Sequence, residues 1–213
     1  MKKIRLVVAS LVLALFTLAI QSNLSYANAK EPSEPIIEII KPEDPEEFIK
    51  EMGWEKPTPN AKLDHIVRIR PSDNGAAHNQ QKIDEDLTAK ALGYSIKVTR
   101  QSSSCGVQPK ARVSGTGNID GNLVLSQTVE VSNSFSSNTS VSAEVVTASV
   151  GFDVTEKKSK TAQYTVNTNG KNYQIVAYDD FDRFEFDVYL FGAKTGTGVA
   201  SKQVGFCYAA YQI

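Results

Sequence analysis

The stretch TASVGFDVTEKKSKTAQYTV, residues 147–166, decides the class of fold, because small polar residues alternate in it with apolar ones. A period of two places one set of side chains on each face of a β-strand. One predicted face is apolar and is formed by Ala148, Val150, Phe152 and Val154 on the first arm and Ala162, Tyr164 and Val166 on the returning arm. The opposite face is rich in Thr and Ser, and residues 156–159 supply the turn. The stretch therefore predicts a two-faced β-hairpin.

The chain on both sides of this hairpin carries further β signals. Asn169-Gly170 stands between two alternating runs and predicts a type I′ hairpin turn. Several short strands at such spacing predict a mainly β domain, either an antiparallel β-sandwich or an elongated β-sheet. The predicted strands after Arg112 are 112–119, 122–135, 140–155, 160–168, 171–178, 183–191 and 197–211, and two shorter ones precede them at 65–70 and 94–99.

Two short helices are also predicted. Residues 80–92 space their apolar side chains at i, i+4 and i+8, and Gly93 follows as the stop signal. Residues 45–53 begin with proline and two glutamates and end on glycine, which are helix start and stop signals. The apolar side of this second helix consists of Phe48, Ile49 and Met52, with Trp54 just beyond.

The first 29 residues have the pattern of a secretion signal. Basic residues Lys2, Lys3 and Arg5 precede an apolar run over 6–20, and small residues follow at 27–29. The run is shorter than the ~20 apolar residues that a membrane-spanning helix needs. We therefore predict a signal peptide, cleaved after Ala29, and a secreted, extracellular protein.

Residues 30–60 differ in composition from the rest of the chain. They hold six of the eight prolines, and four Lys stand against nine Asp or Glu. Such composition favours disorder. The segment is therefore predicted to be an acidic, Pro-rich linker or pro-segment, either a flexible spacer or a detachable cover for the domain. Residues 61–213 are predicted to form the β-rich domain.

The two cysteines, Cys105 and Cys207, fit an exported protein. An even count in an oxidising compartment favours a disulfide. Closing a loop of about 100 residues would stabilise the fold by roughly 4–5 kcal/mol in the chain-entropy model. Two alternatives remain open at this point, namely free thiols and a catalytic cysteine, which would need a histidine partner.

Charge and motifs exclude several functions. Residues 61–213 carry 16 basic and 15 acidic side chains, so they offer no basic patch for nucleic acid. We find no nucleophile–histidine pairing, nucleotide fingerprint or metal-ligand spacing, and we therefore predict a protein that is not an enzyme and has no cofactor. The acidic stretch 179–182 suits either a turn or oxygen ligands for Ca²⁺, without the spacing of an EF-hand.

The Ser/Thr-rich hairpin between long predicted strands resembles the insertion region of the aerolysin-like β-pore-forming proteins, of the epsilon-toxin and mosquitocidal-toxin type. The resemblance covers about residues 122–191 and includes the alternating stretches 164–166, 170–175 and 184–188. It implies a monomer that binds a target membrane or a cell-surface receptor, forms a homo-oligomer there and releases the hairpin to build a pore, often after proteolytic trimming. The seven residues of the apolar hairpin face would then face the membrane. Residues 30–60 would then be the trimmed segment.

The alternative is a secreted, non-catalytic β-sandwich that binds an extracellular or cell-wall partner. An ordinary sheet with one buried and one solvent-exposed face shows the same alternation of apolar and polar residues. Two features favour this alternative. Lys157-Lys158 at the predicted tip would have to cross the membrane, at about 2–4 kcal/mol per charge at mid-bilayer, and a Cys105–Cys207 bond would restrict refolding.

Overall fold

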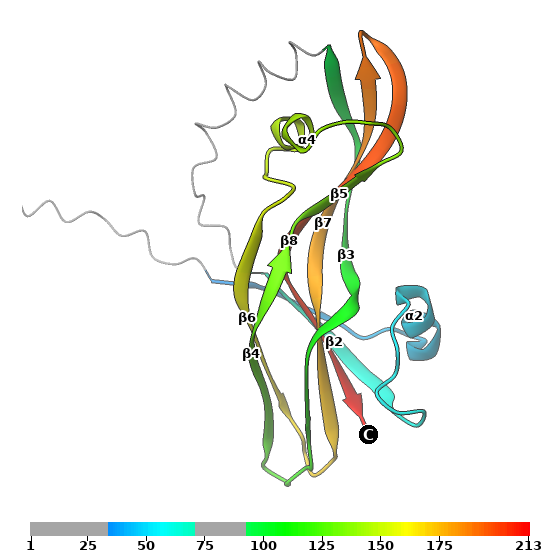
Figure 1. Cartoon of the computed structure of the whole chain (residues 1–213). Helices are drawn as coiled ribbons and strands as arrows, with labels where there is room; N and C mark the ends of the chain where they lie inside the picture. Colours follow the sequence, from blue (N-terminus) through cyan, green and yellow to red (C-terminus); the bar gives the residue numbers. More distant parts are fainter. Residues whose placement is uncertain (1–33, 71–92) are drawn as a thin grey trace, which may run out of the picture. The chain divides into compact units, whose positions relative to one another are not determined.

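The computed structural model describes residues 34–70 and 93–213, and antiparallel strands dominate them (Figure 1). This confirms the predicted mainly β class. The predicted helix over 80–92 and the signal peptide lie outside the described residues. The elements are β1 (Ile36–Ile40), α2 (Pro45–Met52), β2 (Lys62–Arg70), β3 (Tyr94–Gly115), β4 (Asn122–Ser132), β5 (Ser134–Ser137), α4 (Ala143–Val150), β6 (Lys157–Asn167), β7 (Tyr173–Leu190) and β8 (Ala193–Gln212). Among the described residues, neither helix is long and apolar enough to cross a membrane.

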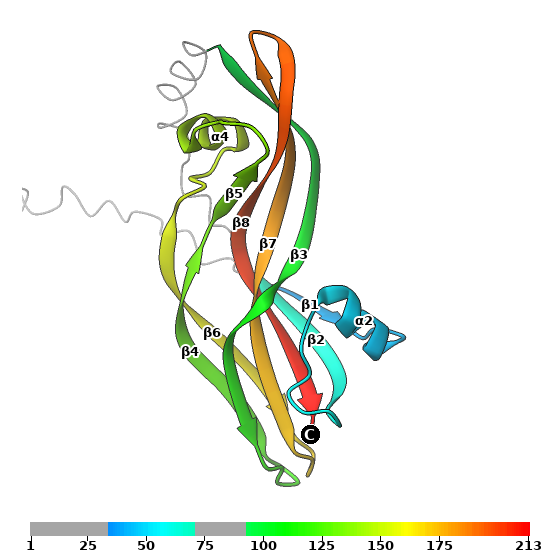
Figure 2. The same cartoon turned by 45° about the vertical axis from the view of Figure 1, so that its right-hand side comes forward.

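The strands form two sheets. The larger has the order β1-β2-β8-β7-β3, with β5 also paired to β8, and the smaller is a two-stranded ribbon of β4 and β6. Each strand of the ribbon has 11 residues. Figure 2 shows the ribbon to the left of the large sheet, with α4 beyond the end where β5 leaves the ribbon.

The ribbon and α2 pack on opposite faces of the large sheet. The ribbon side buries an apolar core made of Leu125, Val131, Ala162, Val166, Ile175, Ala177, Phe206 and Tyr208, among others. The α2 side buries a second core that includes Ile49, Trp54, Ile66, Val176, Tyr178, Cys207 and Tyr211. The large sheet is therefore apolar on both faces over its middle, and alternate residues of β7 and β8 serve the two cores.

The described part of residues 30–60 is folded against the sheet. β1 pairs with β2, and α2 forms where the sequence predicts it, with Asp44 accepting hydrogen bonds from two backbone N–H groups and Gly53 in the left-handed region at φ 64°. Trp54 is buried, stacks on Tyr178 with ring centroids 4.2 Å apart and donates from Nε1 to the Gly106 carbonyl. Composition favoured a flexible spacer here, but α2 and the buried Trp54 that follows it anchor the segment. Its removal by a protease stays a prediction.

The disulfide joins Cys105 and Cys207, with Sγ atoms 1.96 Å apart. It links β3 to β8, each of which pairs with β7. Cys105 lies in the middle of β3, and Cys207 lies near the end of β8. The catalytic and free-thiol alternatives for these two residues are therefore set aside.

The strand predicted over 140–155 is wrong. Residues 143–150 form helix α4, which ends at Gly151 with φ 81°. Ala143, Val146 and Val150 recur at i, i+3 and i+7 and contact one apolar core with Phe186 and Val188 of β7. The helical period was thus also present in the sequence, and tertiary packing selected it over the period of two.

The predicted turn at Asn169-Gly170 is confirmed, whereas the predicted hairpin around it is not. Both residues have positive φ, 45° and 79°, and Lys171 N–H closes the turn on the Thr168 carbonyl at 2.9 Å. The strands that flank it, however, lie in different sheets, since β6 pairs with β4 and β7 pairs with β3 and β8. The turn therefore carries the chain from one layer to the other.

Candidate functional site

The ribbon of β4 and β6 has the two-faced character that the sequence predicts, but with a different partner for β6. Its strands pair in one unbroken register from Asn122–Asn167 to Ser132–Lys157. The outer face is exposed and mostly polar, with the opposed pairs Val124–Thr165, Ser126–Gln163, Thr128–Thr161 and Glu130–Ser159. The hydroxyls of Thr128 and Thr161 lie 3.1 Å apart on this face.

The inner face of the ribbon is apolar over most of its length and covers the large sheet. It pairs Leu123 with Val166 and Leu125 with Tyr164, and Ala162 is fully buried. Toward the other end this face also carries Lys158 and Lys160, opposite Val131 and Val129. Tyr164 stacks on Tyr208 of β8 with ring centroids 5.1 Å apart.

The seven predicted membrane-facing residues are divided between two places in the structure. Ala162, Tyr164 and Val166 lie together on the inner face of the ribbon. Ala148 and Val150 lie on α4, and Phe152 and Val154 follow it, so they do not form the first arm of a hairpin. Phe152 and Val154 are 4% and 1% exposed and are packed against β7 and β8.

The connection between the two ribbon strands, residues 133–156, is hereafter called the linking segment. It runs through β5, which pairs with β8 over Ser134–Ser201 to Ser137–Gly198, and then through α4. It is held by contacts with the large sheet and by a short helix of 8 residues. Isolated helices of this length are marginal in water, so tertiary packing stabilises α4.

Asn133 joins both ends of the linking segment to the sheet. Its side-chain amide donates to the Asp153 carbonyl at 2.8 Å and to the Glu156 carboxylate at 3.2 Å, and its oxygen accepts from Gln203 N–H at 2.8 Å. Its backbone N–H donates to the Glu156 carbonyl at 2.9 Å, which continues the ribbon by one step. The sequence does not single out Asn133, because one buried asparagine has no local signal that distinguishes it from its neighbours in a Ser/Asn-rich run.

A hydrogen-bonded chain ties β2 to the ribbon. His65 Nε2 lies 2.8 Å from the Tyr164 hydroxyl, and its Nδ1 lies 2.9 Å from the Asp64 carboxylate, which also accepts from Tyr173 at 3.0 Å. Burial acts to raise the pKa of Asp64, but the hydrogen bonds from His65 and Tyr173 outweigh it, so the pKa lies below its usual 3.8. Burial, aided by the charge of Asp64, raises the pKa of Tyr164 to about 12, and the phenol is therefore neutral at pH 7.

This chain predicts a pH-dependent contribution to stability. Because folding lowers the pKa of Asp64, its ionised form stabilises the fold above pH 3.8, and this contribution is lost as the pH falls through the lower folded value. We expect Asp64→Asn to lower the free energy of unfolding at pH 7, and the difference from wild type to shrink at pH 3. Urea titrations of both proteins at pH 7 and pH 3 measure the difference in the free energy of unfolding. An equal difference at both would contradict a role for the charge.

The adjacent carboxylates of β7, Asp179 and Asp180, form ion pairs with basic side chains of the same chain. Asp180 is fully buried and accepts from Arg68 at 2.7 Å and from Arg70 at 2.6 and 3.0 Å. Asp179 lies 3.2 Å from Lys110 Nζ, and burial raises its pKa against the opposing effect of that lysine. The described residues contain no cluster of three metal-ligating side chains. In this stretch of β7 the two buried carboxylates therefore pair with basic side chains. The sequence had suggested them as oxygen ligands for Ca²⁺.

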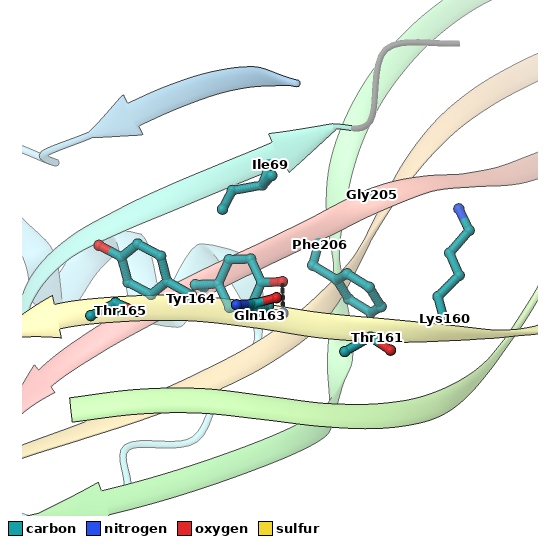
Figure 3. A pocket seen from close by; sticks show the side chains of 9 residues that line it. Ile69, Lys160, Thr161, Gln163, Tyr164, Thr165, Gly205 and Phe206 are labelled. Carbon is teal, nitrogen blue, oxygen red and sulfur yellow. Dashed lines mark hydrogen bonds between the residues drawn. The ribbon is translucent and has the colours of Figure 1, made fainter. Parts of the chain in front are cut away.

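A pocket of about 630 Å³ lies beside the ribbon, between β6 and the large sheet (Figure 3). Side chains or backbone of β6, β8 and β2 line it, with Ile69, Phe206 and Tyr208 on the sheet side and residues 160–165 on the ribbon side. Tyr208 reaches across it, and its hydroxyl accepts a hydrogen bond from the Gln163 backbone N–H at 2.9 Å. Burial raises the pKa of Tyr208 to about 12, so this hydroxyl also keeps its proton.

Comparison with known proteins gives a distant similarity to a solved structure. No protein-family profile and no curated protein matches the chain. The chain is similar to a crystal structure described as "Putative pore-forming toxin from Bacteroides vulgatus", with 8% sequence identity and a TM-score of 0.26. The match covers 55% of this chain and 53% of that one, so this chain spans about half the length of that protein.

Proposed function

We propose that this chain is a secreted, membrane-active protein of the aerolysin-like kind, in which the linking segment refolds into a membrane-spanning continuation of the β4–β6 ribbon. The observation that carries the proposal is the ribbon register. Extended beyond its last pair, Ser132–Lys157, it pairs Asn133 with Glu156 and continues to Ala143–Val146. The backbone hydrogen bond from Asn133 to Glu156 is the first step of that continuation.

The continued register separates polar from apolar side chains. On the outer face it pairs Ser134–Thr155, Ser136–Asp153, Asn138–Gly151, Ser140–Ser149 and Ser142–Thr147. On the inner face it pairs Phe135–Val154, Ser137–Phe152, Thr139–Val150, Val141–Ala148 and Ala143–Val146. The polar outer face of the ribbon continues without a break, and the inner face becomes mostly apolar again beyond a polar band at the base of the hairpin, formed by Lys158, Lys160 and the pair Asn133–Glu156. The seven residues predicted from the sequence all fall on the inner, lipid-facing side of this extended hairpin.

The length of the continuation suits a span, and the two lysines stay outside it. The continuation has 11 residues in each arm, from 133 to 143 and from 146 to 156, and a tilted strand crosses the hydrocarbon core with about 9–11 residues. The tip becomes Glu144-Val145. Lys157 and Lys158 then lie at the base of the hairpin, on the near side of the membrane, so the cost of carrying two lysines across the bilayer does not arise.

The disulfide permits this change. Cys105 and Cys207 both belong to the large sheet, and neither the ribbon nor the linking segment contains a cysteine. The bond therefore restrains the large sheet and leaves residues 122–167 free to rearrange. Refolding has to break the β5–β8 pairing, the side-chain hydrogen bonds of Asn133 with Asp153 and Gln203, and the burial of Phe152 and Val154.

The remaining parts of the proposal come from the sequence. The protein is exported by a signal peptide cleaved after Ala29, it is not an enzyme and needs no cofactor, and its partners are a target membrane or a cell-surface receptor and further copies of itself. Nucleic acid is not among them. The structural disulfide fits an oxidising compartment. The alternative, a secreted non-catalytic β-sandwich with an extracellular or cell-wall partner, is favoured by the pocket beside β6, and in it the linking segment keeps its present fold.

Dye release from lipid vesicles tests the proposal. The chain from Lys30 onward is added to vesicles of several compositions and to vesicles made from native membranes, with and without limited proteolysis of residues 30–60. We expect release of the dye together with a detergent-resistant oligomer on a gel. Intact vesicles in every case would contradict membrane activity and favour the sandwich alternative.

A further inference from the structure

The turn between β7 and β8 exposes a phenylalanine in an unfavourable backbone conformation. Phe191 is 84% exposed and has φ 50°, in the left-handed region. A bulky side chain rarely adopts this region, because its Cβ atom then crowds the backbone. Phe191 therefore costs backbone strain and contributes little burial to the fold. A residue that the fold itself does not favour points to a function at this turn.

The turn at Asn169-Gly170 provides an internal comparison. Its two residues have φ 45° and 79°, and those of Phe191-Gly192 are nearly the same, 50° and 83°. Asparagine tolerates the left-handed region well, whereas phenylalanine does not. Residues 167–171 read NTNGK, but residues 190–193 read LFGA. The same backbone conformation thus has a polar sequence at one end of β7 and an apolar sequence at the other.

The residue that precedes β3 holds the exposed ring in place. The Phe191 N–H donates to the Gly93 carbonyl at 2.8 Å. The ring lies directly over the backbone of Gly93, where a Cβ atom would collide with it. The backbone donor of Phe191 is thus already paired, so this residue can leave water without an unsatisfied N–H.

We propose that the turn of residues 190–193, hereafter called the apolar tip, inserts Phe191 into the interface of a lipid bilayer and makes the first membrane contact of the soluble monomer. This inference rests on the proposed function for the membrane as the partner. It does not require the linking segment to refold, because the tip is already exposed in the present fold.

Size and composition favour a bilayer over a protein as the partner of the apolar tip. The tip has four residues at the end of a hairpin, while a specific protein–protein interface buries about 800 Å² on each partner. Behind the tip lie Tyr94 and Tyr189, both partly buried, and then Lys194, which pairs with Asp187 at 2.8 Å. Tyrosines and lysines next to an apolar end are typical of the level of the lipid headgroups.

The apolar tip lies at the end of the large sheet toward which the linking segment runs. As β5 advances, its partners on β8 change from Ser201 to Gly198, that is, toward Ala193. Helix α4 lies at the same end, since its core includes Tyr94 and Val188. Figure 1 shows α4 and the β7–β8 turn at the upper end of the sheet. Docking of the tip would therefore bring the end with the linking segment to the bilayer.

Binding to vesicles of phosphatidylcholine tests the tip. The chain from Lys30 onward is mixed with the vesicles, and the bound fraction is measured by flotation. Burial of a phenylalanine side chain is worth a factor of about 10 to 150 in a partition equilibrium, so we expect Phe191→Asn to weaken binding about tenfold or more. The control is Ile119→Asn, in the loop at the other end of β3. Ile119 is 81% exposed, and we expect this substitution to leave binding unchanged.

Two further measurements distinguish a membrane contact from a role in folding. Asparagine suits the left-handed turn, so we expect Phe191→Asn to keep or raise the urea midpoint of unfolding. Phe191→Trp keeps an aromatic ring, and we expect it to bind as well as the wild type. Its fluorescence should be quenched by brominated lipid, against the constant signal of Trp54, the one tryptophan of the natural chain, which is buried.

The outcomes separate this inference from the proposed function. Absent binding of the wild type, equal binding of Phe191→Asn, equal losses in Phe191→Asn and Ile119→Asn, or a lower urea midpoint of Phe191→Asn would overturn the inference. Vesicle leakage by Phe191→Asn at the wild-type rate would overturn it as well, and the proposed function would stand. Binding that depends on Phe191, without leakage from any vesicle, would support the inference and contradict the proposed function.

Discussion

A disulfide between β5 and β8 should reduce vesicle leakage to background. The variant carries Ser134→Cys and Ser201→Cys, at two positions that lie directly opposite each other in the β5–β8 pair. Opposed residues in antiparallel strands have Cα atoms about 4.5–5.5 Å apart, within the range that a disulfide bridges. The bond would hold β5, the beginning of the linking segment, on β8. The arm that begins at Asn133 could then not separate from the large sheet. Leakage is measured before and after mild reduction, which should restore it.

A second disulfide provides the matched control. Thr128→Cys with Thr161→Cys ties β4 to β6, which are paired in the present fold and remain paired in the extended hairpin. We expect this variant to leak like the wild type under oxidising conditions. Wild type treated with the same reductant accounts for any effect on Cys105 and Cys207. Full leakage by the oxidised β5–β8 variant would contradict release of the linking segment.

A charge on the inner face of the extended hairpin should block insertion, whereas one on the outer face should not. In the continued register Thr139 lies on the lipid side, opposite Val150 and near the middle of the span. Arginine there costs about 2–4 kcal/mol at mid-bilayer, which is a factor of about 30 to 1,000 in the insertion equilibrium of each copy. We expect Thr139→Arg to lower the rate of dye release at least about 30-fold.

The next residue is the control. Ser140→Arg places the same charge one position along the chain, on the polar side. Both residues lie between β5 and α4 in the present fold, so the two variants disturb the same connection. We expect Ser140→Arg to leak within a few-fold of wild type, and urea titration to confirm that both variants are folded. Equal losses would contradict the proposed sidedness.

Much of the fold follows from local pattern, because strands with one buried face alternate and helix ends carry recognisable residues. The alternation in β6, the start and stop of α2 and the left-handed turn at Asn169-Gly170 were all predictable for this reason. The pairing of the strands was not. Nothing local shows that β6 pairs with β4, which lies 24 residues earlier, rather than with β7 across a tight turn.

The linking segment shows the limit most clearly. Residues 147–154 fit a strand by their period of two, and residues 143–150 fit a helix by the spacing of Ala143, Val146 and Val150. Burial of that helical stripe against β7 selects the helix in the present fold. In the present fold the alternation of residues 147–154 does not form a strand face. In the proposed refolded hairpin it separates the lipid-facing side chains from the polar ones. A sequence that satisfies two periods at once is what a segment with two folded forms requires.

A fluorophore scan of residues 147–154 tests the central claim most directly. Single cysteines at these eight positions are labelled with an environment-sensitive dye, and quenching by a lipid-borne quencher is recorded on vesicles. The extended hairpin predicts quenching at Ala148, Val150, Phe152 and Val154 and little at the four positions between them. Quenching with a period of three to four residues would show that α4 lies on the membrane as a helix, and this result would contradict the proposed refolding. The absence of quenching at all eight positions would contradict it as well.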